Sequence, residues 1–348
     1  MEIVTERRGY NMNIIGYDLL SNGNEGIRYA WSSEQFKNYI ESAAFINRSK
    51  GKFENISGYT TSVSSGCFLK VQDLQCLFCR TGNMLPFGGF LNYKEIAKQN
   101  IFMVLTDIYC NNNPELKNKM REFAYMGQGE PGFSYSQVRL AIELTNRVMK
   151  KLGQKVYRHV FATCGVTKAI QDYMYDLENY FTEKVTLHLS LHATINRELI
   201  MPIERLYPYR DSLKYLDYIF DISREKTCIG IMLFNNFTPT GKDYSYSNSC
   251  SNILDIIKNL NPNTCRLSFC EYNSSPILGS SNEYAEADAQ KLLKISQSMG
   301  FESKLFSSFG KEKKAACGML GGKNPDNIAS KKWNELDTYA EELINELS

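Results

Sequence analysis

The stretch SYSQVRLAIELTNRVMKKLGQKVYRHVFAT (residues 134–163) joins a helical pattern to a strand pattern and indicates the fold class. Over 134–152 the apolar residues recur at the spacing of one helix face, and Gly153 follows at the point where a helix is readily closed. Ser134 and Gln137 have the spacing of a capping box, which predicts the start of this helix. The β-branched and aromatic residues of 156–163 then predict a strand.

The same alternation continues in both directions from about residue 58. The further strands are predicted at 59–64, 121–126, 184–191, 227–236 and 264–270. The further helices are predicted at 92–109, 166–178, 208–220, 249–260 and 283–299. Six strand–helix pairs in succession indicate an α/β protein whose parallel sheet is either open or curved into a partial barrel.

The two ends of the chain differ from this alternating region. Residues 1–57 are rich in Tyr and Asn and contain one helix-like stretch, SSEQFKNYIESAAFI (32–46). The glycine-containing segment 309–323 has no periodicity and predicts a flexible loop. A final amphipathic helix is expected over 326–347, with Asp326 as its N-cap. We therefore predict three parts, which are an N-terminal extension (1–57), the α/β barrel region (58–308), and a loop with the C-terminal helix (309–348).

Composition excludes several classes of protein. The 348 residues are 43% hydrophobic and 22% charged, so the chain is globular and not disordered. Lys and Arg number 40 against 38 Asp and Glu, and a net charge of +2 predicts no global basic field for nucleic acid. No signal-like start and no run of 18 apolar residues is evident, so a cytoplasmic location without membrane insertion is expected. In that compartment, the ten cysteines indicate metal ligands, catalytic thiols or core residues.

Three cysteines stand close together in GCFLKVQDLQCLFCRTG (66–82), directly after the first strand of the alternating region. Cys67, Cys76 and Cys79 provide three thiolates, which suits a [4Fe–4S] cluster whose fourth iron stays open to another molecule. A zinc site that takes a distant fourth ligand is an alternative. Two core cysteines beside an unrelated third are another alternative.

A series of motifs follows these cysteines in a defined order. It comprises VSSGC (63–67), CLFCRTG (76–82), MGQGEP (126–131), TCGV (163–166), LSLHA (189–193), MPI (201–203), Asn273 and AACGMLGG (315–322). The series resembles the radical S-adenosylmethionine (radical SAM) superfamily and, within it, the RlmN/Cfr group of adenine methyltransferases. The resemblance covers about residues 60–323 and implies a partial (β/α)6 TIM-like barrel with a [4Fe–4S] cluster and S-adenosylmethionine (SAM) as cofactors.

The resemblance also implies a role for each motif residue. Cys67, Cys76 and Cys79 would hold the cluster, and Cys317 would be the catalytic residue, which accepts a methyl group from SAM and passes it to the substrate. SAM would be bound by Gly129, Glu130, Thr163, Ser190, His192 and Asn273. In a parallel barrel these residues would meet at the carboxyl ends of the strands. Taken alone, GQGEP is also compatible with an ordinary turn, and His192 with a structural histidine.

The family's partners are implied in the same way. An adenine in RNA is the expected substrate, and an external electron donor such as flavodoxin or ferredoxin is the expected reductant. Only about 57 residues precede the barrel region, which leaves little room for an RNA-binding domain. A nucleotide, a peptide or a natural-product intermediate therefore stays open as the substrate.

Two departures from the family pattern are plain. Eight residues separate Cys67 from Cys76 where the family has three, and such an insertion can loop out at small entropic cost. Ser62 stands where the family has the cysteine that resolves its protein–substrate thioether, and a hydroxyl cannot perform thiol–disulfide chemistry. Cys164 or Cys270 could replace it, or the enzyme could make a different modification. A metal-binding RNA-interaction protein without catalysis is the remaining hypothesis.

Overall fold

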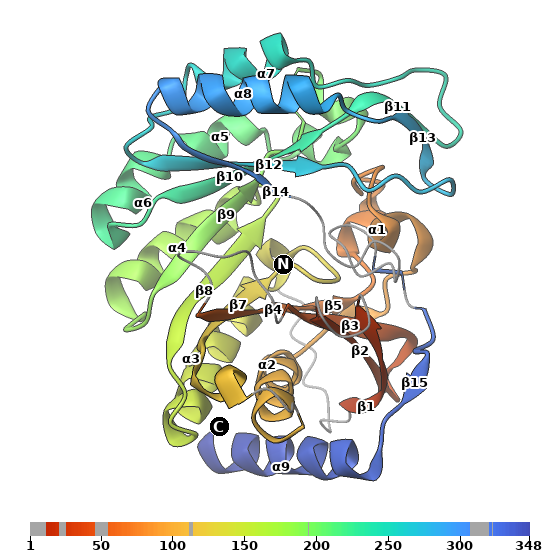
Figure 1. Cartoon of the computed structure of the whole chain (residues 1–348), viewed down its shortest axis with the longest axis vertical. Coiled ribbons are helices and arrows are strands. Elements are labelled where there is room, and N and C mark those ends of the chain that lie inside the picture. The colour runs from red at the N-terminus through yellow and green to blue at the C-terminus, as the bar shows by residue number, and fades with distance from the viewer. Residues whose placement is uncertain are drawn as a thin grey trace.

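The computed structural model describes residues 12–20, 26–45, 55–110, 114–193, 195–306, 320–321 and 323–348. Within these ranges a single sheet of 11 strands runs through the molecule in the order β14-β12-β10-β9-β8-β7-β4-β3-β2-β1-β15. Figure 1 shows this sheet curving around the centre of the molecule, with helices on its outer side.

One half of the sheet is parallel and forms the partial barrel. Its strands are β4 (Ile56–Thr61), β7 (Met120–Tyr125), β8 (Val156–Thr163), β9 (Val185–Ser190), β10 (Thr227–Leu233), β12 (Cys265–Glu271) and β14 (Glu302–Phe306). The predicted α/β class with a large parallel sheet is thereby confirmed. The first strand was predicted at 59–64 but begins earlier, because Ile56 already pairs with Met120 of β7. Strand β14 was not predicted.

The other half of the sheet is antiparallel and comes from the N-terminal region. It consists of β1 (Met12–Leu20), β2 (Gly26–Ser33) and β3 (Phe36–Phe45), and β3 pairs with β4. The helix predicted at 32–46 is therefore wrong. Phe36, Ile40 and Ala44 are buried together, and their spacing of four satisfies a strand period of two as well as a helical period. Pairing with both neighbouring strands decides in favour of the strand.

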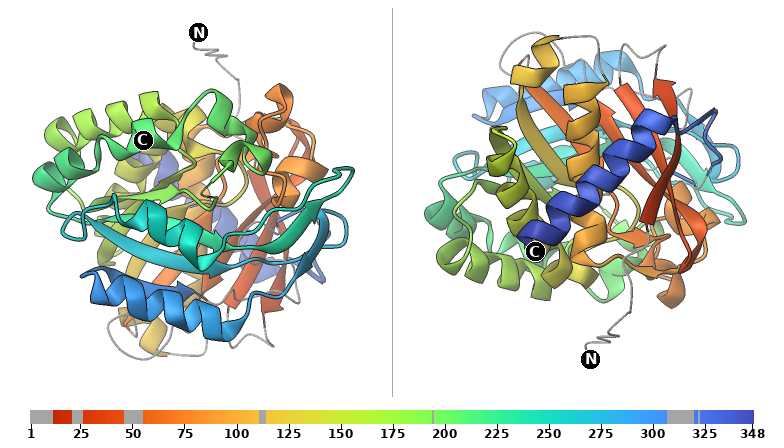
Figure 2. Two further views of the ribbon diagram at one scale, coloured as in Figure 1. Left: turned by 90° about the horizontal axis from the view of Figure 1, so that it is seen from above. Right: turned by 90° about the horizontal axis from the view of Figure 1, so that it is seen from below.

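Helices follow the strands and cover the outer face of the sheet. They are α2 (Tyr93–Tyr109), α3 (Tyr135–Lys151), α4 (Thr167–Asn179), α5 (Tyr209–Leu213), α6 (Leu216–Ser223), α7 (Cys250–Ile257) and α8 (Glu286–Ser298). The helix predicted at 208–220 is thus two short helices. The C-terminal helix α9 (Lys331–Leu347) packs across α2 and α3, as the right-hand view of Figure 2 shows. Buried Lys98 of α2 holds it there through Asp337 at 2.9 Å and Glu341 at 2.6 Å.

Two predicted helix starts are wrong in detail. Ser134 precedes α3, but its side chain makes no capping hydrogen bond, and Gln137 instead accepts a hydrogen bond from the backbone N–H of Tyr93 at 3.0 Å. Ser330 caps α9 in place of Asp326, since its hydroxyl accepts from the N–H of Trp333. Gln137 is therefore engaged by the start of α2, which leaves α3 without the predicted capping box.

Several short elements complete the fold. They are β5 (Ser64–Ser65) with β6 (Gly89–Phe90), β11 (Asn235–Pro239) with β13 (Gly279–Asn282), the short helix α1 (Arg80–Met84), and β15 (Asn327–Ile328), which pairs with β1. Every helix in the described ranges is too short or too polar to cross a bilayer.

Candidate functional site

The cysteine segment begins just beyond β4 and folds back on itself. Cys67 immediately precedes a 3-10 helix over Phe68–Gln72, and Cys79 immediately precedes α1. Asp73 closes the 3-10 helix in the left-handed conformation, with φ of 52°. The insertion between the first two cysteines is therefore a compact helical turn, which returns the chain toward Cys76.

The three thiols of this segment lie near one another. Burial raises the pKa of Cys67 to about 12, and the Cys79 thiol contributes to that rise. Burial also raises the pKa of Cys76, and both other thiols add to it. No set of three or more His, Cys, Asp or Glu side chains in the described ranges surrounds a single metal ion. An iron–sulfur cube gives each thiolate its own iron, so the ligands of a cluster stand further apart than the ligands of a single ion.

Backbone donors point at two of the sulfurs. The N–H groups of Leu69 and Glu130 donate to the Cys67 sulfur, and those of Thr81 and Gly82 donate to the Cys79 sulfur. Hydrogen bonds to cysteine sulfur favour the thiolate form and tune the potential of a cluster. These donors favour the thiolate forms of Cys67 and Cys79 and partly offset the effect of burial on the two pKa values.

Asn83 ties the cysteine segment together, and the sequence pattern did not point to it. Its side-chain nitrogen donates to the carbonyl oxygens of Cys76 at 2.8 Å, Leu77 at 3.3 Å and Cys79 at 2.7 Å. The N–H of Leu77 donates to the carbonyl of Ile200 at 2.9 Å, directly before the MPI motif. An asparagine has no fixed position in the sequence relative to a cysteine pair, so this role of Asn83 cannot be recognised from the sequence alone.

The GQGEP and TCGV motifs meet at the ends of β7 and β8. One Glu130 carboxylate oxygen accepts from the Thr163 hydroxyl at 2.5 Å, and the other accepts from the Cys164 N–H at 2.9 Å. Gly129 has φ of +98°, and a Cβ there would lie 2.1 Å from Ser64 Oγ. Glycine is required because the turn is left-handed and touches the strand beside it.

A buried arginine joins these motifs to the LSLHA motif. Arg197 is 1% exposed and donates to the carbonyl oxygens of Cys164 at 2.9 Å and Ser190 at 3.2 Å, while Glu204 neutralises it at 2.6 Å. Ser190 ends β9 and is half-buried. Arg197 lies only five residues after His192, but no motif in the sequence indicates it.

His192 lies beside the cysteine segment. Its ring contacts Phe78, which stands between Cys76 and Cys79, edge to face at 5.6 Å between ring centres. His192 has φ of 53°, and its N–H donates to the carbonyl of Gly230 at 2.7 Å. Burial lowers the pKa of His192 to about 3, so the imidazole is neutral. Asn273 is buried two residues beyond the end of β12.

The predicted catalytic residue, Cys317, lies outside the described residues, as do Lys311, Lys313 and Lys314 beside it. Three positions further on, the carbonyl of Leu320 accepts a hydrogen bond from the Thr81 hydroxyl at 2.6 Å. This end of the segment therefore lies against α1, next to the predicted cluster ligands.

Ser62 has a structural role. It is fully buried, its hydroxyl donates to the carbonyl of Glu41 at 2.5 Å, and it accepts from the N–H of Gln128 at 2.8 Å. Cys164 is also buried, and its thiol lies near Glu130 and Cys76. Cys270 lies near the end of β12 and is half-buried.

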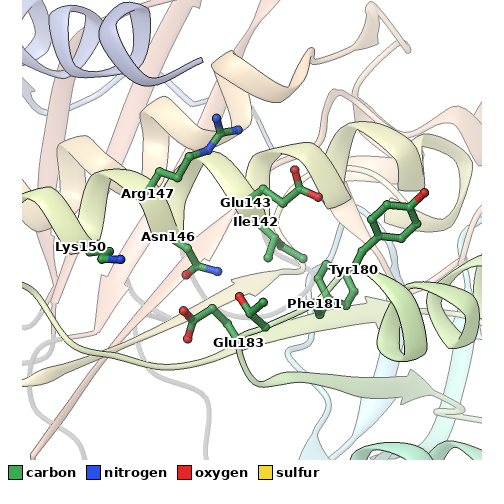
Figure 3. A pocket seen from close by; sticks show the side chains of 9 residues that line it. Ile142, Glu143, Asn146, Arg147, Lys150, Tyr180, Phe181 and Glu183 are labelled. Carbon is green, nitrogen blue, oxygen red and sulfur yellow. The ribbon is translucent and has the colours of Figure 1, made fainter.

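A surface pocket lies away from all of these residues. It is formed by α3 and the segment after α4, and Figure 3 shows its mixed lining of Glu143, Asn146, Arg147, Lys150 and Tyr180. None of the predicted site residues lines it, so it is no part of the predicted centre.

Comparisons with known proteins agree with the resemblance drawn from the motifs. No protein-family model matches the chain. The chain is 26% identical to "Probable dual-specificity RNA methyltransferase RlmN" of Flavobacterium johnsoniae, over 77% of this chain and 70% of that protein. It is 26% identical to the protein of the same name from Caldanaerobacter subterraneus subsp. tengcongensis, over 84% and 75%, and 23% identical to that from Malacoplasma penetrans, over 81% and 72%.

A solved structure has the same fold. A radical SAM methyltransferase from Sphaerobacter thermophilus superposes with a TM-score of 0.72 at 18% identity, over 92% of this chain and 84% of that one. Together these findings confirm that the chain is RlmN/Cfr-like and has a radical SAM methyltransferase fold.

Proposed function

We propose that this RlmN/Cfr-like chain is a radical SAM methyltransferase whose [4Fe–4S] cluster is held by Cys67, Cys76 and Cys79. The observation that carries the proposal is the meeting of two motifs at Glu130. Its backbone N–H donates to the Cys67 sulfur, while its carboxylate is held by Thr163 and Cys164. One residue thus joins the proposed cluster site to the proposed cofactor site.

The residues around Glu130 suit the methionyl end of SAM. A carboxylate has about four acceptor positions, and Thr163, Gly132 and the Cys164 N–H occupy three of them. The Cys164 thiol, a weak donor, occupies the fourth, and an ammonium group would displace it readily. Gly129, Ser190, His192 and Asn273 are proposed to complete the SAM site.

The cluster and SAM, when bound, supply one-electron chemistry that can functionalise a carbon that polar methyl transfer cannot reach. The chain contributes shielding, because Glu130, Thr163 and Cys164 are all buried. It also contributes a neutral imidazole at His192, which can donate or accept one hydrogen bond without adding charge.

The proposed substrate is an adenine-type base in RNA, methylated at an sp2 carbon through a methylated Cys317. The names of the relatives support RNA as the substrate class, and a low-potential electron donor such as flavodoxin or ferredoxin is the proposed partner. We also propose that the chain has three parts, with boundaries between residues 57 and 58 and between residues 308 and 309.

A second candidate is a different radical SAM modification, of a nucleotide, a peptide or a natural-product intermediate. The surroundings of Ser62 favour it, since this side chain is buried and hydrogen-bonded on both sides. The position of the family's resolving thiol is therefore occupied by a residue that holds the N-terminal strands to Gln128.

The test combines cluster content, SAM affinity and modification of Cys317. The anaerobically reconstituted chain is expected to hold iron and sulfide, to release 5′-deoxyadenosine when reduced with SAM, and to carry a methyl group on the Cys317 peptide in mass spectra. Glu130→Gln should weaken SAM binding about 10- to 100-fold, since a hydrogen bond to a charged group contributes roughly 1.5–3 kcal/mol.

The matched control is Glu143→Gln, in the outer pocket, which should leave the affinity for SAM unchanged. A chain that forms no cluster, or that binds SAM equally well with Gln at 130, contradicts the proposal. An unmodified Cys317 together with 5′-deoxyadenosine release would select the second candidate.

A further inference from the structure

Three charged side chains are buried together in the N-terminal sheet. Asp18 of β1 lies directly opposite Arg28 of β2, and Arg28 lies opposite Ala43 of β3. Glu41 is two residues from Ala43 and therefore shares its face of the strand. The Arg28 guanidinium contacts both carboxylates, since Nε donates to Asp18 Oδ2 at 2.6 Å and Nη1 donates to Glu41. All three side chains are at most 1% exposed, and we call them the Arg28 cluster.

Gln128 connects the Arg28 cluster to the GQGEP turn (127–131). The Gln128 side chain is fully buried, and its amide nitrogen donates to Glu41 Oε2 at 3.1 Å and to the carbonyl of Tyr39 at 3.3 Å. The Ser62 hydroxyl accepts from the Gln128 N–H and donates to the carbonyl of Glu41. Gln128 lies two residues before Glu130. Glu41 thus holds the turn through its side chain and, by way of Ser62, through its backbone.

The same cluster holds the segment that follows the AACGMLGG motif. The Nη1 and Nη2 groups of Arg28 donate to the carbonyls of Lys323 and Asn324, both at 3.3 Å. The second oxygen of Asp18 accepts from the N–H of Asp326 at 2.6 Å. Directly beyond, β15 pairs with β1, as Figure 1 shows. Residues 323–326 and the GQGEP turn are therefore attached to one buried cluster from opposite sides.

Glu41 joins the two sides because it is a carboxylate. One of its oxygens faces Arg28 and the other faces Gln128. A glutamine at this position would offer only one oxygen, which cannot replace both acceptors. A buried donor that loses its acceptor destabilises the structure by more than a typical hydrogen bond stabilises it. The positions of Arg28 and Gln128 therefore depend on the same side chain.

We propose that Glu41 is a positioning residue for the SAM site, and that through Arg28 it couples this site to residues 323–326. The inference rests on the proposed function, in which Glu130 receives the ammonium group of SAM. Gly129 offers no side chain to anchor the turn, so Gln128 is the anchor nearest to Glu130 on its N-terminal side. Coupling between two sites is reciprocal, so the attachment of residues 323–326 and the affinity for SAM should change together.

Hydrogen exchange tests the coupling without any cofactor. Amide exchange of the purified full chain is followed by mass spectrometry in peptides that contain Gly127 and Gln128, whose N–H groups are hydrogen-bonded in the fold. Glu41→Gln should speed exchange there about tenfold, because the opening of a local segment requires less free energy when a buried hydrogen bond is lost. Asp18→Asn changes only the side of the cluster that holds residues 323–326, and it should speed exchange in the turn about threefold.

The reverse direction is tested with Gln128→Glu. This variant places a carboxylate against Glu41 and should speed exchange in residues 326–328, although it contacts none of them. The double variant Glu41→Gln/Gln128→Glu should exchange more slowly than either single variant in both regions. Its amide at position 41 can accept from Arg28 and donate to the carboxylate at position 128, so each donor again has an acceptor.

Asp337→Asn is the matched control. Asp337 is also a buried carboxylate that pairs with a buried cation, Lys98, at 2.9 Å, and it accepts from the N–H of Ile14 in β1 at 3.4 Å. The variant should leave exchange at Gly127 and Gln128 at the parent rate. Equal exchange of the turn in Glu41→Gln and Asp337→Asn would overturn the proposal. A double variant that exchanges as fast as Glu41→Gln would overturn it as well.

The affinity for SAM is then measured by calorimetry on the anaerobically reconstituted variants. Glu41→Gln should weaken SAM binding about tenfold and Asp18→Asn about threefold, while Asp337→Asn should bind SAM as the parent chain does. Equal affinity in all three variants would refute the positioning role. If Asp18→Asn speeds exchange in the turn but the parent chain binds no SAM, the coupling stands and the proposed function alone is refuted.

Discussion

Asn83→Asp is expected to loosen the proposed cluster site without changing the shape of any side chain. The Asn83 amide nitrogen donates to the carbonyls of Cys76 and Cys79 at 2.8 and 2.7 Å, and more weakly to that of Leu77. An aspartate would put a carboxylate oxygen against these carbonyls. Two net hydrogen bonds of about 0.5–1.5 kcal/mol each are lost, so the cluster-binding conformation loses about 2 kcal/mol, which is roughly a 30-fold shift in population.

Iron retention measures this effect directly. The reconstituted chain is exposed to an iron chelator under anaerobic conditions, and the loss of cluster absorbance is followed over time. Asn83→Ala removes only the donors, while Asn83→Asp adds repulsion, so the loss should be slowest in the parent chain, faster with Ala and fastest with Asp. Thermal unfolding of the same samples separates a local effect from global destabilisation.

Asn259→Asp is the matched control, because its side chain donates to the carbonyl of Asp255 on an exposed helix end and the change in charge is the same. It should lose iron at the parent rate. If Asn83→Asp lost iron no faster than this control, the three hydrogen bonds would not position the cysteines, and the reasoning would be refuted.

Three further outcomes follow from the described contacts. Ser62→Cys should lower the free energy of unfolding by about 2 kcal/mol in urea titrations, because the Gln128 N–H loses its acceptor. The new thiol should resist alkylation in the native protein, and rapid labelling would contradict the burial of this side chain. Gly127→Ala should lower the melting temperature, since its Cβ would lie 2.9 Å from the backbone nitrogen of Ser62; an unchanged value would show that the turn can shift. Burial lowers the pKa of all three histidines to about 3, so between pH 7 and 5.5 the histidines take up protons only in the unfolded chain. Each histidine therefore lowers the free energy of unfolding by about 1.2 kcal/mol over this pH range. Burial raises the folded pKa of Asp107 to about 6, so this residue takes up protons in the folded chain and offsets about 0.8 kcal/mol of that loss. Urea unfolding at the two pH values should therefore differ by about 3 kcal/mol, with less stability at pH 5.5, and equal stability would mean that the imidazoles are protonated in the fold.

The local sequence pattern was sufficient to predict those helices and strands whose conformation depends on their own residues. Helix α3 lies within one residue of its predicted bounds, because its apolar stripe and the glycine after it act over a few residues. Strands β8 and β9 are similar cases, since both read as short β-branched and apolar runs. The order of the motifs also indicated which strand ends would meet, and Glu130 does meet Thr163 and Cys164.

Distant contacts decided the features that the pattern missed. The spacing of Phe36, Ile40 and Ala44 suits a helix and a strand alike, and only pairing with β2 and β4 selects the strand.

The sequence by itself determined the parallel α/β core and the residue types of the proposed centre, since both depend on neighbours along the chain. The tertiary structure alone decided that Asn83 spans the cysteine segment, that Ser62 is closed in by the N-terminal strands, and that Arg197 joins Cys164 to Ser190. These pairings join residues whose separation in sequence carries no local signal, and they form only when burial of the core has brought their strands and loops together.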